Sequence, residues 1–127
     1  MRTSPLLAAM LLAATGVAAG QGTEVPVYVG DLPDAACADW GEVGGTAALT
    51  VRGGPGPEFA AIGRLASGHR VHLCDASGDW LGVVYSPGGG PSDCGVSAPV
   101  TDKQPYMGPC RSGWVHRKFV RVAPREA

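Results

Sequence analysis

The sequence is poor in aromatic and charged residues, and it has no excess of positive charge. Aromatic residues make up 6% and charged residues 17% of its 127 positions. The formal net charge is −1, and loss of Arg2 with a leader segment would change −1 to −2. Arg117, Lys118, Arg121 and Arg125 form one short basic cluster, which is typical of a solvated strand edge. A nucleic-acid partner would require a larger basic patch, so we expect none.

Motifs for catalysis and metal binding are also missing. There is no Gly-x-Ser-x-Gly turn, no His-Glu-x-x-His helix and no Cys-x-x-Cys pair. His69 and His72 lie three residues apart in an expected strand, so they face opposite sides and are poorly placed to share a metal. A cysteine nucleophile would need a lowered pKa and a nearby base. We therefore expect no enzyme activity, no catalytic residues, no metal and no cofactor.

Residues 1–20 have the three parts of a secretory signal peptide. Arg2 supplies the positive start, Leu6 to Ala19 form an apolar run, and small residues precede polar Gln21. Cleavage after Ala19 and cleavage after Gly20 are both compatible with this pattern. An uncleaved membrane anchor is the alternative, but the run is shorter than the roughly 20 apolar residues that span a bilayer. We expect a periplasmic or secreted protein with no membrane insertion after signal cleavage.

Four cysteines follow the leader: Cys37, Cys74, Cys94 and Cys110. An even number in a small exported chain predicts two disulfides, although zinc remains a competing use. Three pairings are possible. We favour Cys94 with Cys110, which bracket one irregular segment, and Cys37 with Cys74, which would tie an N-terminal arm to the strands. Each bridge would contribute on the order of 2–4 kcal/mol.

The 20 glycines and 11 prolines favour short strands joined by turns, with no helix longer than a turn. Alternating apolar and polar residues predict the remaining strands, at 40–43, 47–52, 60–65, 69–74, 80–85, 113–116 and 119–122. Residues 25–29 also alternate, but a proline demotes them to an edge strand or an extended arm. We expect an all-β fold with an N-terminal arm over 21–46 and one domain over 47–124. Residues 86–111 form a long irregular loop inserted in that domain.

Five blocks of sequence resemble the bacterial SH3-like family, in the order typical of it. They are Leu49-Thr-Val-Arg-Gly-Gly-Pro-Gly56, Ile62-Gly-Arg-Leu65, Gly68-His-Arg-Val71, Gly78-Asp-Trp80 with Val83, and Gly113-Trp-Val-His116. The resemblance implies a small SH3-like barrel that binds a ligand without catalysis. Family members are often attached to cell-wall hydrolases and recognise wall peptides or glycans, and others are adaptors for proteins. The insertion over 86–111 and the four cysteines depart from the family pattern.

Aromatic side chains are the best candidates for a binding site, because they bury a large area at low entropic cost. We expect Tyr85, Tyr106 and Trp114 to line a groove between the loops at 53–57 and 86–111. Packing remains an alternative role for each of them, and Trp114 occupies a mostly structural family position. Arg52 and His116 lie beside the two most family-like strands and complete the predicted site.

Two functions are compatible with this site. A monomeric module could bind cell-wall peptidoglycan or its stem peptides. It could instead bind another envelope protein as an inhibitor, immunity factor or assembly accessory. A wall binder needs a concave aromatic groove, whereas a protein binder could present residues 86–111 as a convex knob.

Overall fold

The computed structural model describes residues 23–30, 32, 35–88 and 92–123, and its regular structure is almost entirely β. The elements, in chain order, are β1 (Tyr28–Val29), β2 (Asp39–Val43), β3 (Ala48–Arg52), β4 (Ala61–Ala66), β5 (Arg70–Ser77), β6 (Trp80–Tyr85), β7 (Gln104–Pro105), β8 (Arg111–His116), the 3-10 turn η1 (Arg117–Phe119) and β9 (Val120–Ala123). The predicted all-β class is confirmed. The predicted signal peptide, residues 1–20, lies outside the described residues.

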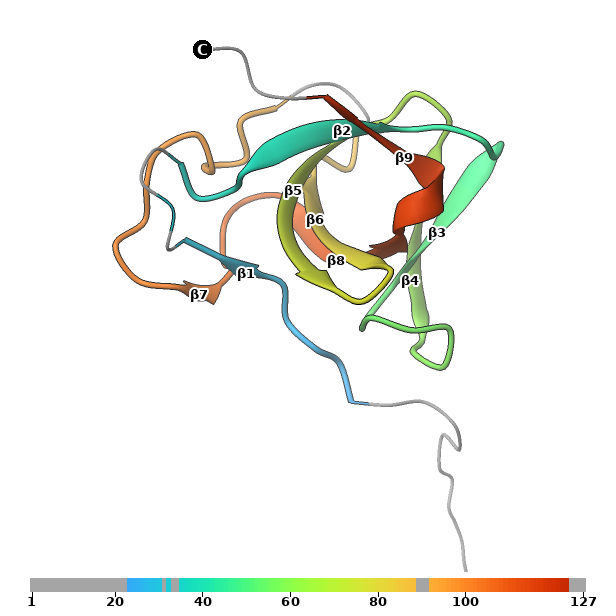
Figure 1. Ribbon diagram of the computed structural model, residues 1–127, viewed down its shortest axis with the longest axis horizontal. Helices are drawn as coiled ribbons and strands as arrows, with labels where there is room; N and C mark the ends of the chain where they lie inside the picture. Colours follow the sequence, from blue (N-terminus) through green and yellow to red (C-terminus); the bar gives the residue numbers. More distant parts are fainter. Residues whose placement is uncertain (1–22, 31, 33–34, 89–91, 124–127) are drawn as a thin grey trace, which may run out of the picture.

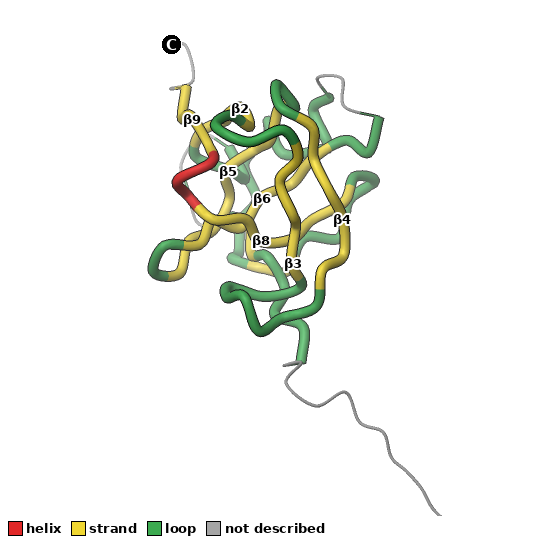
Figure 2. The backbone as a smooth tube through the Cα atoms, turned by 90° about the vertical axis from the view of Figure 1, so that its right-hand side faces the viewer, coloured by secondary structure: helices red, strands yellow, loops and turns green. Residues whose placement is uncertain are grey.

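Seven of the strands form one antiparallel sheet in the order β4-β3-β8-β6-β5-β2-β9. The sheet curls around a common centre (Figure 1). Its end strands, β4 and β9, are not hydrogen-bonded to each other and lie at opposite sides of the view in Figure 2. The sheet is therefore strongly curved but does not close by hydrogen bonds. Its strand β2 pairs with both β5 and β9, so the end of the expected N-terminal arm is an integral strand of the sheet.

The two faces of the curled sheet each carry their own hydrophobic core. The inner core consists of Val43, Leu49, Val51, Leu65, Val71, Val83, Tyr85 and Val115. The outer core consists of Val27, Val29, Ala36, Cys37, Val84, Cys94, Val96 and Trp114. Successive residues of a strand point to opposite faces, so Val83 and Val84 enter different cores although both are fully buried.

Two segments cover the outer face, and we call them together the cap: the described residues of 23–38, and residues 92–110. Within the cap, β1 pairs with β7, and the backbone N–H of Tyr106 donates to the carbonyl of Val27 at 2.8 Å. Figure 1 shows β1 and β7 side by side, outside the curl of the main sheet. The segment 86–111 was expected to be irregular, but its residues 92–110 contain the short strand β7 and form part of the cap over the sheet.

Both disulfides lie in or against the cap. Cys37–Cys74 joins the N-terminal segment to β5, and Cys94–Cys110 closes the inserted loop on itself. This is the favoured one of the three possible pairings, and it is confirmed. Three of these four sulfur positions are on the cap, so the bridges stabilise the layer that covers the sheet rather than the sheet itself.

Two glycines allow the layers to approach closely. A Cβ at Gly82 would lie 2.7 Å from the Cβ of Asp75 and 3.1 Å from Val27 of the cap. A Cβ at Gly113, on the opposite face, would overlap the side chain of Val51 in the inner core. Neither position has room for a side chain, because the sheet is buried on both faces here.

We predict that Gly113→Ala lowers the free energy of unfolding by roughly 1–3 kcal/mol, because the added methyl overpacks the inner core. Urea unfolding followed by tryptophan fluorescence measures this. Gly88→Ala is the matched control, since a Cβ there has no neighbour within 4 Å. Equal unfolding midpoints for the two variants would contradict the close approach.

We predict that loss of Cys94–Cys110 loosens the cap before the sheet unfolds. In a Cys94→Ala/Cys110→Ala variant, amide hydrogen exchange should rise over residues 92–106 while Val83 and Val115 keep their protection. Val83 on β6 and Val115 on β8 pack in the inner core, to which the cap contributes no residue. Unchanged exchange over 92–106, or an equal rise at Val83, would show that cap and sheet unfold as one unit.

Candidate binding surface

The structure separates the aromatic residues that were predicted to share one groove. Trp114 belongs to the outer core and is 2% exposed, and its indole N–H donates to the carbonyl of Val25 at 2.8 Å. Tyr85 belongs to the inner core and is 4% exposed. The two rings thus lie on opposite faces of the sheet, and the predicted groove through Tyr85, Tyr106 and Trp114 is wrong.

Tyr106 holds the inserted loop together. Its hydroxyl donates to the carbonyl of Cys94 at 2.7 Å and accepts from the backbone N–H of Cys110 at 3.0 Å. Both bonding directions of the hydroxyl are therefore used within the loop that the disulfide closes. The ring packs half-buried against the outer core. These contacts assign Tyr106 to packing, which was the alternative left open for it.

The other two predicted residues, Arg52 and His116, do come together. They line an open hollow of about 250 Å³, which we call the aromatic hollow. It is lined by Leu49, Thr50, Arg52, Pro57, Trp80, His116, Lys118 and Phe119. The pairing of β3, β8 and β6 places these residues near the point where η1 begins.

Hydrogen bonds and stacking fix the orientation of these side chains. Nδ1 of His116 accepts from the backbone N–H of Lys118 at 3.2 Å and so caps η1. The imidazole meets the Trp80 ring edge-on, with the ring centres 5.4 Å apart. Nη1 of Arg52 donates to the carbonyl of Phe59 at 2.9 Å, which anchors the loop after β3. The described residues of the lining include two cations, Arg52 and Lys118, and no carboxylate.

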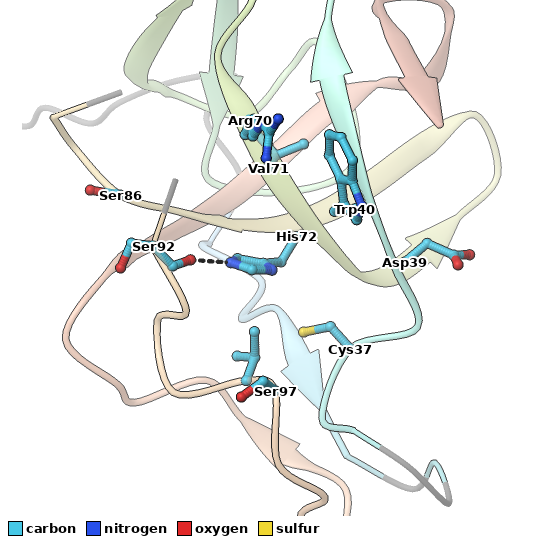
Figure 3. A pocket seen from close by; sticks show the side chains of 10 residues that line it. Cys37, Asp39, Trp40, Arg70, Val71, His72, Ser86, Ser92 and Ser97 are labelled. Carbon is cyan, nitrogen blue, oxygen red and sulfur yellow. Dashed lines mark hydrogen bonds between the residues drawn. The ribbon is translucent and has the colours of Figure 1, made fainter. Parts of the chain in front are cut away.

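A second hollow, of about 190 Å³, lies where the cap meets the outer face of β2 and β5, and we call it the seam hollow (Figure 3). It is lined by Cys37, Asp39, Trp40, Arg70, Val71, His72, Ser86, Ser92, Val96 and Ser97. The guanidinium of Arg70 lies 4.4 Å from the centre of the Trp40 ring. Nε2 of His72 is 2.6 Å from the carbonyl oxygen of Ser92, so the imidazole donates to the inserted loop.

The sequence prediction missed the seam hollow. Trp40, Arg70 and His72 were not among the predicted binding residues. The sequence does carry a sign of them, because Arg70 and His72 alternate with Val71 and Leu73 and so share one face. That face becomes a hollow only because the cap stops beside it.

The two hollows offer aromatic rings for stacking and cationic side chains. Within the described part of the chain, no three His, Cys, Asp or Glu side chains gather as metal ligands. Nor does a helix in those residues have the length and apolar character needed to cross a membrane.

No protein-family model, curated protein or solved structure matches this chain.

Loss of the proton from buried Tyr85 lowers the free energy of unfolding at alkaline pH. Burial raises the pKa of its hydroxyl above the ordinary value of 10.0, and nearby Arg111 partly opposes this shift. The folded protein thus holds the proton more tightly than the unfolded chain. The resulting stability is complete below about pH 10 and is lost as the pH rises through the pKa of the folded state.

We predict that Tyr85→Phe reduces the loss of stability between about pH 8 and about pH 11, because phenylalanine has no proton to lose. Urea midpoints at the two pH values measure this. Tyr28→Phe is the control and should keep the wild-type loss, since Tyr85 is still present. An unchanged pH dependence in Tyr85→Phe would contradict the assignment.

Proposed function

We propose that the chain is a non-catalytic, exported SH3-like module that binds peptidoglycan or its stem peptides through the aromatic hollow. The observation that carries this proposal is the meeting of Arg52 and His116 with Trp80 in one open hollow, where no carboxylate is found among the described lining residues. The five sequence blocks that resemble the bacterial SH3-like family support the same reading.

The chemistry of the hollow suits a ligand with both flat and acidic parts. The exposed face of an aromatic ring offers a large apolar surface on which a sugar ring or a peptide can lie. Arg52 and Lys118 supply N–H donors for carboxylates, and such charge-assisted bonds are stronger than neutral ones. Because His116 uses Nδ1 to cap η1, its neutral ring carries the proton on Nε2 as a further donor.

The covalent structure is consistent with an exported protein. Two disulfides are typical of chains that fold in an oxidising compartment. The sequence pattern of residues 1–20 supports export as a cleaved signal peptide. Together they favour a periplasmic or secreted location, where peptidoglycan is accessible.

One observation favours the second function, binding of an envelope protein. The side chain of Met107 is 87% exposed, beside a hollow of the cap lined in part by Val96, Val100 and Pro105. Exposed apolar surface of this kind is typical of protein interaction sites. Against it, Cys94 and Val96 bury part of the inserted loop in the outer core, which favours a loop fixed to the sheet over a projecting knob.

Co-sedimentation of the oxidised protein with purified peptidoglycan sacculi tests the proposal, at a salt concentration that suppresses weak charge attraction. We predict saturable binding that an Arg52→Gln/His116→Asn variant weakens about tenfold or more, because charge-assisted contacts are lost. Glutamine keeps a donor for the Phe59 carbonyl, and asparagine keeps an acceptor for η1, so the fold should survive.

Lys103→Ala is the control, because Lys103 is an exposed cation on the cap, outside the lining of the aromatic hollow. It should bind sacculi as the wild type does. Absence of binding by folded wild-type protein would overturn the wall reading. A search for protein partners would then compare the wild type with Met107→Ser.

A further inference from the structure

We propose that the seam hollow is a second binding site, which takes the carboxylate group of a small organic acid. The site shares no lining residue with the aromatic hollow and is built by β2, β5 and the cap. The proposal does not rest on the proposed function, because the two hollows have no residue in common and each can be disabled by its own substitutions.

Arg70 is the group that would recognise the carboxylate. Its guanidinium stacks on Trp40 at 4.4 Å, and this contact covers one face of the planar group. The N–H donors at the edge of the group stay accessible, since Arg70 is exposed. A planar fork held in this way matches the two oxygens of a carboxylate and loses little freedom when it binds.

Hydrogen bonds between the imidazoles and the inserted loop fix the polar part of the lining in place. His72 donates to the Ser92 carbonyl at 2.6 Å, and His69 contacts the Ser86 carbonyl through Nε2 at 2.9 Å. These two imidazoles attach the inserted loop to the strand that carries Arg70. The serine hydroxyls that line the hollow add further hydrogen-bonding groups.

The charge in the hollow favours an anion. Among the described lining residues, Arg70 and Asp39 carry a permanent charge, and Glu42, which lies opposite Arg70 in the register of β2 and β5, is not part of that lining. Figure 3 shows the Asp39 carboxylate pointing away from Arg70, His72 and Ser92, on the other side of β2. The guanidinium therefore dominates the interior, and its partner within the described lining is the Trp40 ring.

The size of the hollow limits the ligand to one small group. About 190 Å³ is below the roughly 300–1,000 Å³ of sites for drug-sized molecules. The hollow therefore suits the end of a larger molecule or a small acid. Two sources supply this chemistry: the C-terminal carboxylate of a short peptide, and an acidic sugar whose ring would lie against Trp40.

Proton–nitrogen NMR of the oxidised, full-length chain tests the site, with the indole N–H of Trp40 as the reporter. The peptide arm uses N-acetyl-D-alanyl-D-alanine and its C-terminal amide. The sugar arm uses N-acetylmuramic acid and neutral N-acetylglucosamine. We expect at least one acid to shift the Trp40 signal saturably while its neutral counterpart does not. The indole of Trp114 should stay unmoved, because it is buried and bonded to Val25.

The affinity of Arg70 variants for the same acid gives the second test of the site. Arg70→Gln should weaken binding of that acid about 10- to 100-fold, the range expected for losing a hydrogen bond to a charged group. Arg70→Lys should weaken it less, because the charge remains while the planar fork is lost. Arg64→Gln on β4, also exposed, is the control and should bind as the wild type does.

Three results would overturn the proposal: no acid shifts the Trp40 indole, the neutral counterparts shift it equally, or Arg70→Gln binds with unchanged affinity. The unmoved signal of Trp114 verifies in each spectrum that the variant is folded. The Arg52→Gln/His116→Asn variant should bind the acids normally, so this proposal and the proposed function fail independently.

Discussion

Burial of the central strand β6 on both faces is the constraint on which the rest of the structure depends. Its inward residues, Val83 and Tyr85, pack in the inner core, and its outward residue Val84 is equally buried under the cap. The neighbouring Trp114 adds a large apolar ring to the outward face. Without a covering layer, the outward side chains of Val84 and Trp114 would be exposed to water. The cap, which the N-terminal segment and the inserted loop form together, keeps these side chains out of water. The outer face stays buried only while the cap is folded onto it.

The cap is held by few but well-placed interactions. The pairing of β1 with β7 joins its two segments, and Asp75 accepts from the backbone N–H of Tyr28 at 3.0 Å, which attaches β1 to the sheet. Such short strands contribute little alone, so the two disulfides matter because they lower the entropy of the unfolded chain. The disulfides therefore stabilise the outer core more directly than the curled sheet beneath it.

The seam hollow exists because the cap ends beside β2 and β5, whereas the aromatic hollow is formed by β3, β6, β8 and η1 with the loop after β3. The seam hollow carries Trp40 and Arg70, and the aromatic hollow carries Arg52 and His116. The layer that removes Trp114 from solvent therefore also forms one wall of the seam hollow.

The sequence by itself determined the all-β class and most strand positions, because alternation and turn residues are local properties. It favoured one of three disulfide pairings, and the tertiary structure decided between them. The sequence also marked Arg52 and His116, which the structure brings into one hollow. Only the tertiary structure decided that Tyr85 and Trp114 face opposite cores, that Tyr106 is used inside the loop, and that Arg70 joins Trp40. Alternation of apolar and polar residues along a strand predicts which residues share a face of the sheet, but it does not predict what covers that face. Here the covering layer comes from segments at residues 23–38 and 92–110, which meet only after the chain has folded.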